Sequence, residues 1–139
     1  NRRTGLFDTN LTLKGNGLLN YGMPGSMLSV SSNGDSVGTG VVWATHPLNG
    51  NANQQVRPGR FDAYDARNVQ HQLWNSNMLP NRDSVGGFSK FNTPIVANGK
   101  GYIATFSNRL NVYGLLPTSI GINSKHNLTL LVNIFPNPT

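Results

Sequence analysis

The chain contains no cysteine and no glutamate, and it has no long apolar run. Without cysteine it can form neither disulfide bonds nor thiolate metal sites, and it offers no cysteine nucleophile. Its longest apolar runs, at 129–132 and 134–135, fall far short of the roughly 20 residues that a membrane-spanning helix needs. The sequence therefore predicts no transmembrane segment.

Turn-forming residues, by contrast, are abundant. The 139 residues include 20 Asn, 16 Gly and 8 Pro, which are poor in helix interiors and common in turns. This composition excludes a helical bundle and a coiled coil. The apolar fraction of 37% argues against full disorder, because the aromatic residues fall within alternating segments. The length suits one domain.

Positive charge exceeds negative charge, with 11 Lys and Arg against five Asp and a formal net charge of +6. The cations are spread through predicted turns rather than gathered along one segment. Nucleic-acid-binding proteins usually carry a basic stripe with aromatic residues interleaved. The sequence therefore predicts a scattered, solvated positive surface and no nucleic-acid partner.

Alternating apolar and polar residues predict strands in two successive cycles. Residues 48–59 read as a loop within the first cycle. The second cycle repeats the order of the first: an apolar segment ending in Asn-Gly, a strand, a turn, and a strand ending in Tyr. Such a repeat is typical of a propeller or a solenoid. The first cycle contains segments 26–31, 40–45, 60–65 and 72–75, and the second contains 90–97, 102–106 and 110–114.

Within these cycles, Ala63-Tyr64-Asp65 is followed by Trp74. With the surrounding segments, this pattern resembles the blades of quinoprotein-like (PQQ-like) β-propellers, although Asn68-Val69 stands where those blades carry Thr-Gly. The resemblance covers residues 22–117. It implies an all-β fold made of antiparallel four-stranded blades of a partial β-propeller. In such blades the Asp caps a turn and the Trp docks between neighbouring blades, roles that would fall to Asp65 and Trp74, with Ala63 completing the motif.

A second resemblance lies at the end of the chain. Residues 132–139, VNIFPNPT, are similar to the opening of the C-terminal sorting domain of type IX secretion substrates. The alternative is an ordinary Pro/Asn turn. The resemblance implies export by the type IX machinery and an extracellular or outer-surface location. The predicted organisation is then a segment of a preceding blade at 1–25, two blades at 26–117, a linker at 118–131 and the start of the sorting domain at 132–139.

Residues that could carry chemistry are few and scattered. The spacing of His46, His71 and His126 does not favour a metal site. Because Asp62 and Asp65 are three apart, a strand would place them on opposite faces, which is poor geometry for acid–base work. No catalytic or metal-binding residue is therefore predicted. His46 is the one candidate ligand contact, since it ends a strand before Pro47 and a long loop.

The aromatic side chains allow two interpretations. As members of alternating strands they are expected to pack between blades, and the alternative is a platform on which sugars stack. The set is Trp43, Phe61, Tyr64, Trp74, Tyr102, Phe106 and Tyr113.

Three function hypotheses follow. The leading one is a non-catalytic binding or structural portion of a secreted or cell-surface bacterial β-propeller, with no bound cofactor. The second is one wall of an enzyme site, in a quinoprotein dehydrogenase or a polysaccharide-active enzyme, whose catalytic residues and pyrroloquinoline quinone ligands lie upstream. The third is an adhesin or filament component. The expected partners are upstream blades of the same protein or other copies of it, the type IX machinery, and carbohydrate.

Overall fold

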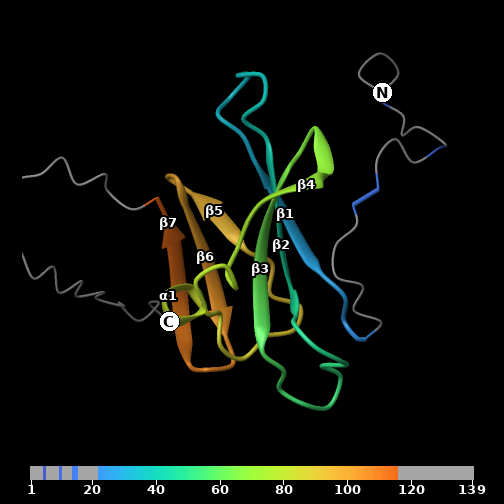
Figure 1. The fold of residues 1–139 in the computed structure, drawn as a ribbon, viewed down its shortest axis with the longest axis vertical. Helices are drawn as coiled ribbons and strands as arrows, with labels where there is room; N and C mark the ends of the chain where they lie inside the picture. The colour runs from blue at the N-terminus through green and yellow to red at the C-terminus, as the bar shows by residue number, and fades with distance from the viewer. Residues whose placement is uncertain (1–4, 6–9, 11–13, 16–21, 116–139) are drawn as a thin grey trace, which may run out of the picture.

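The computed structural model describes residues 5, 10, 14–15 and 22–115 (Figure 1). This part of the chain is almost entirely β-structure, which confirms the all-β fold class. The predicted linker at 118–131, the predicted sorting segment at 132–139 and most of segment 1–25 lie outside the described residues. The elements are β1 (Met27–Ser31), β2 (Val41–Pro47), β3 (Gly59–Asp65), β4 (Asn68–Asn75), α1 (Pro80–Asp83), β5 (Ile95–Ala97), β6 (Lys100–Thr105) and β7 (Arg109–Gly114).

The strands form two antiparallel sheets in which each strand pairs with the next along the chain. The first sheet has the order β1-β2-β3-β4, and the second has the order β5-β6-β7. Every pairing within both sheets is antiparallel. The four-stranded first sheet agrees with the predicted unit. The second sheet has three strands within the described residues, as many as the segments of the second cycle, whereas the resemblance implies four-stranded blades.

Local residues explain the tight connections. Asn98 and Gly99 both have positive φ, 50° and 69°, between the paired residues Ala97 and Lys100. A two-residue turn with positive φ at both positions matches the right-handed twist of the strands that it joins. In the β3–β4 turn, the carboxylate of Asp65 accepts the backbone N–H of Arg67 at 2.8 Å. Both turns fix the register of their hairpins.

Some element boundaries differ from those expected. Strand β4 begins at Asn68 rather than at residue 72, and it continues across a bulge in its pairing with β3. Strand β5 begins at Ile95 rather than at residue 90. The residues before it form a loop in which Phe91 has a positive φ of 59°.

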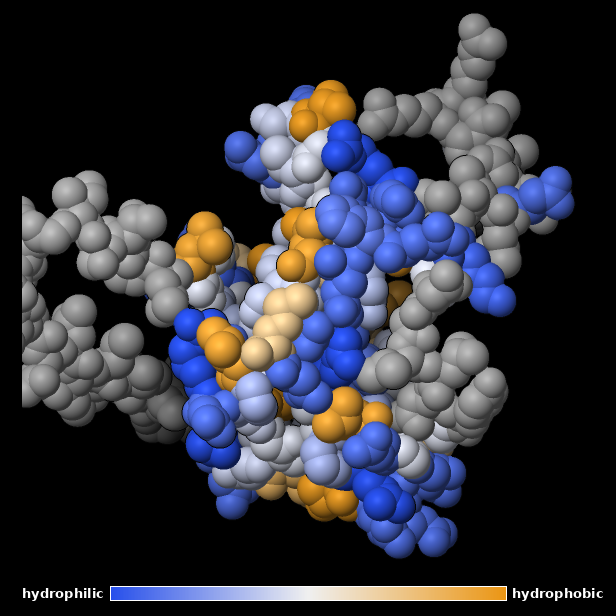
Figure 2. Space-filling model, in the orientation of Figure 1, coloured by the Kyte–Doolittle hydropathy of each residue, from blue (hydrophilic) through white to orange (hydrophobic). Residues whose placement is uncertain are grey.

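The two sheets pack face to face, and the core lies between them. Phe61 of β3, Ile103 of β6 and Val85 of the β4–β5 connection are buried there. Trp43, Trp74 and Tyr113 pack against this cluster. Seen from outside, hydrophobic residues occur as separate patches among hydrophilic ones (Figure 2).

Within the described part of the chain, no helix has the length and apolar character needed to cross a membrane.

Candidate functional site

An aromatic cluster joins the two sheets. The Phe61 ring stacks on Trp43 with a centroid separation of 5.2 Å and meets Trp74 edge-on at 5.9 Å. Tyr113, from the second sheet, lies 5.3 Å from Phe61 and 5.7 Å from Trp74. Offset and edge-on ring pairs of this kind each stabilise by about 0.5–1.5 kcal/mol beyond their burial. The cluster therefore fixes how the sheets sit against each other.

Hydrogen bonds at its rim orient two of these rings. The indole N–H of Trp43 donates to the Ser31 hydroxyl at 2.9 Å. The Tyr113 hydroxyl donates to the carbonyl of Asp83 at 3.1 Å, and the Asn111 amide donates to the Tyr113 oxygen at 3.3 Å. Burial raises the pKa of Tyr113. The polar ends of buried aromatic residues are thus satisfied.

A glycine brings the second sheet close to Phe61. A Cβ placed on Gly101 would lie 3.1 Å and 3.3 Å from two atoms of the Phe61 ring. Phe61 is fully buried against this position. The missing side chain at residue 101 therefore admits the ring against the backbone of β6.

The residues of the Ala63–Asp65–Trp74 pattern lie around this cluster and at the neighbouring turn. Ala63 is buried and pairs with Trp74 across β3 and β4. Trp74 contacts Phe61 of its own sheet and Tyr113 of the other, so it lies between the two sheets. Asp65 caps the β3–β4 turn. Hydrogen bonds from the backbone N–H and side chain of Arg67 lower the pKa of the Asp65 carboxyl.

Three of the seven aromatic residues expected in the core lie elsewhere. Tyr64 and Tyr102 are half-buried on the outer faces of the two sheets, because each alternates with core residues along its strand. Phe106 lies in the β6–β7 turn, with 58% of its surface exposed. Core packing accounts for Trp43, Phe61, Trp74 and Tyr113 only.

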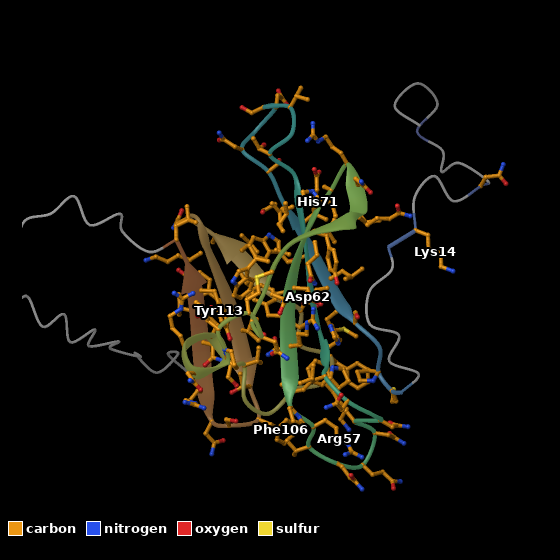
Figure 3. All side chains as sticks on the ribbon, in the orientation of Figure 1. Lys14, Arg57, Asp62, His71, Phe106 and Tyr113 are labelled. Carbon is orange, nitrogen blue, oxygen red and sulfur yellow. The ribbon has the colours of Figure 1, made fainter. Side chains whose placement is uncertain are left out.

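A buried polar network occupies the outer face of the first sheet, opposite the aromatic cluster. At its centre is Asp62 of β3, which is 1% exposed and labelled in Figure 3. One carboxylate oxygen lies 2.9 Å from Nε2 of His46 and 3.1 Å from the Tyr64 hydroxyl. The other accepts from Nε of Arg60 at 2.7 Å. Gln72 extends the network, since its amide N–H donates to the Tyr64 oxygen at 3.3 Å.

The charged groups shift one another's protonation. Burial alone would raise the pKa of the Asp62 carboxyl, but the hydrogen bonds from His46 and Arg60 outweigh it, so the pKa lies below the ordinary value. Burial and the adjacent Asp62 charge raise the pKa of the Tyr64 hydroxyl. The network thus holds a carboxylate and a neutral phenol.

Both ring nitrogens of His46 are engaged within the chain. Nε2 faces Asp62, and Nδ1 lies 2.8 Å from the carbonyl oxygen of Pro47. Which nitrogen donates depends on the tautomer. The residue is 5% exposed. The ligand contact expected at His46 stays a prediction.

Asp83, at the end of α1, serves local structure. Asp83 pairs with Arg82 at 2.6 Å, and hydrogen bonds from that guanidinium lower the pKa of the Asp83 carboxyl. His71 lies on β4, far from Arg57 at the other end of the sheets in Figure 3. No group of three or more metal-ligating side chains comes together in the residues that the structure describes. His126 lies outside them.

Sequence reasoning missed the partners of His46. Arg60, Asp62 and Gln72 stand on two further strands and carry no motif. The signal that could have found them is register. Once β2 and β3 are paired with His46 opposite Arg60, Asp62 becomes a diagonal neighbour of His46 on the same face.

These features define an all-β, antiparallel protein whose two sheets meet through an aromatic cluster. Comparison with protein-family models, with curated proteins and with solved structures finds no match to the chain.

Proposed function

We propose that the chain is a non-catalytic, structural and binding portion of a secreted or cell-surface protein, and that its two sheets belong to a longer stack of similar sheets. A partial β-propeller is the arrangement that this proposal favours. One observation carries it, namely that each sheet has exposed apolar residues on the face turned away from the other sheet.

The sequence repeat does not set how the two sheets face each other. Gly59–Tyr64 aligns with Asn108–Tyr113, so buried Phe61 corresponds to Leu110, which alternates with the inward-facing Tyr113 and points away from the first sheet. Residues 41–45 align with 101–105, so Trp43 corresponds to Ile103, and both side chains face the core. The proposal therefore rests on the outer faces of the sheets.

Within the described residues, the outer face of each sheet carries exposed apolar side chains. On the outer face of the second sheet, Ile95, Leu110 and Val112 are 65%, 60% and 52% exposed. Ile95, Tyr102 and Val112 form one row across the three strands. On the outer face of the first sheet, Leu28 and Val30 are 58% and 68% exposed. Contiguous apolar residues on a sheet face favour coverage by a further layer.

The purified chain tests this proposal. We expect it to bind a hydrophobic fluorescent dye and to self-associate as its concentration rises in sedimentation velocity. The double variant Leu110→Lys, Val112→Lys is expected to lose most of both signals. The matched control, Met78→Lys with Leu79→Lys, changes two exposed apolar residues outside the sheets and is expected to leave both signals unchanged. A monomeric wild type that binds no dye would contradict the stack.

The proposed extracellular or cell-surface location rests on the resemblance of residues 132–139 to a type IX sorting segment. The test is protease accessibility on intact cells of the native host. We expect external protease to remove the protein while a cytoplasmic marker stays whole. Protection of the protein until the cells are lysed would overturn the proposed location.

A further inference from the structure

Three connections gather at one end of the two sheets, which we call the basic loop end: residues 48–58, 84–94 and 106–109. Backbone hydrogen bonds join them. The N–H of Phe88 donates to the carbonyl of Arg57, and the N–H of Phe106 donates to the carbonyl of Gly87, at 2.7 and 2.9 Å. Figure 3 places Arg57 and Phe106 at this same end. The three connections therefore form one continuous surface.

Gly86 and Gly87 bring its side chains together. A Cβ on Gly87 would lie 3.0 Å from a methyl of Val56 and 3.2 Å from Cβ of Phe106. A Cβ on Gly86 would lie 3.5 Å from a terminal nitrogen of the Arg109 guanidinium. Val56 and Phe106 are each more than half exposed. Apolar and cationic side chains thus flank the same short glycine segment.

Phe91 adds a second exposed aromatic ring to the basic loop end, and its backbone is strained. It is 66% exposed, and its φ of 59° is an uncommon conformation for a bulky residue. Its neighbours hold it there, since Lys90 bonds the carbonyl of Asn53 and the Asn92 amide bonds the carbonyl of Ala104. Strained, exposed positions of this kind concentrate at functional sites.

The charge of the basic loop end is of one sign. Its three connections carry Arg57, Lys90 and Arg109 and contain no Asp or Glu. None of these three cations forms an ion pair within the described part of the chain, where Arg60, Arg67 and Arg82 each pair with an Asp. Residues 48–58 also supply three Asn and two Gln. Figure 2 shows hydrophobic residues bordered by strongly hydrophilic ones at this end.

We infer that the basic loop end binds an acidic polysaccharide. Arg and Lys side chains pair with the carboxylates of uronic-acid units, amide side chains bond the hydroxyls, and Phe106 and Phe91 stack on the apolar faces of the sugars. A nucleic-acid groove needs a continuous cationic track along the strand. Three cations spaced among amides suit a ligand with separated charges instead. The choice of polysaccharide rests on the proposed extracellular role.

The test measures binding of an oligogalacturonide to the whole chain by isothermal titration. Arg109→Gln is expected to weaken binding by about tenfold, as for one lost charge-assisted hydrogen bond. Lys100→Gln removes another exposed charge, next to the β5–β6 turn at the opposite end, and is expected to change nothing. Binding should weaken as salt is added. Equal losses in the two variants would overturn the site.

A second variant separates sugar recognition from simple attraction of anions. Phe106→Ala is expected to weaken oligogalacturonide binding while leaving the weaker binding of polyphosphate unchanged. Neutral dextran is expected not to compete. Tighter binding of single-stranded DNA than of oligogalacturonide, or indifference to Phe106→Ala, would contradict the inference. Since purified protein is used, failure here would leave the dye-binding and protease tests of the proposed function untouched.

Discussion

Asp62 holds together the polar network on the outer face of the first sheet. It accepts hydrogen bonds from His46, Arg60 and Tyr64 at full burial. Removing one partner of a buried charge pair leaves the other charge desolvated and unpaired. The network therefore stabilises the fold only when all of its partners are present, and no single bond accounts for that stabilisation.

The substitution Asp62→Asn is expected to lower the free energy of unfolding by about 3 kcal/mol, because His46 and Arg60 lose a buried anionic partner. Urea denaturation followed by tryptophan fluorescence measures this loss. The control is Asp35→Asn, which changes an exposed residue of the β1–β2 connection and is expected to stay within about 0.5 kcal/mol of the wild type. Similar stabilities of the two variants would refute a special role for Asp62.

The same carboxyl predicts a dependence on pH. The pKa of Asp62 lies below its ordinary value of 3.8 in the folded protein, so the unfolded chain takes up the proton first. The stabilisation is complete above that ordinary value and is lost as the pH falls through the folded-state pKa. Unfolding midpoints measured between pH 6 and pH 2 should fall more steeply for the wild type than for Asp62→Asn. Parallel curves would show that Asp62 does not supply the acid sensitivity.

At the scale of the elements, most strands could be predicted from the pattern of apolar and polar residues, because one face of each strand packs on the core and the other faces outward. Segments 40–45 and 60–65 were predicted as strands and correspond to β2 and β3. The start of β4 was missed because Val69 is the one apolar residue between Asn68 and His71, and this part of the strand pairs through a bulge. Lys90 to Pro94 look strand-like, but the positive φ of Phe91 takes that stretch out of the sheet.

The candidate site was less accessible from sequence than the strands were. Asp65 could be assigned to a turn because its partner Arg67 is local. His46 and Asp62 lie 16 residues apart in sequence on two neighbouring strands, so no spacing rule could reveal their contact. Phe106 alternates like a core residue but falls in the three-residue connection before Arg109, which turns it outward.

Gly101 makes a prediction about the packing of elements. Gly101→Ala places a methyl group about 3 Å from the Phe61 ring and is expected to cost about 1–3 kcal/mol through overpacking. Gly114→Ala is the matched control on the same sheet, since its nearest contact would be an ordinary 3.4 Å. Thermal denaturation compares the two. Equal midpoints would mean that Phe61 can move aside at no cost.

For the whole molecule, the arrangement predicts a gradient of protection from hydrogen exchange. β2 and β3 have a bonded neighbour on each side, and β3 lies over the buried core. Strand β5 has three residues and one bonded neighbour. Amides of β2 and β3 should exchange at least about tenfold more slowly than those of β5. Uniform exchange across the strands, measured by mass spectrometry, would argue against this assembly.

The pairing of each strand with the next along the chain has a consequence for how such a chain can change over generations. Each sheet is built from one continuous stretch of sequence, β1 to β4 or β5 to β7. Duplicating or deleting the coding segment of one sheet would therefore add or remove a whole layer in a single event. A sheet assembled from distant segments could not be gained or lost in this way.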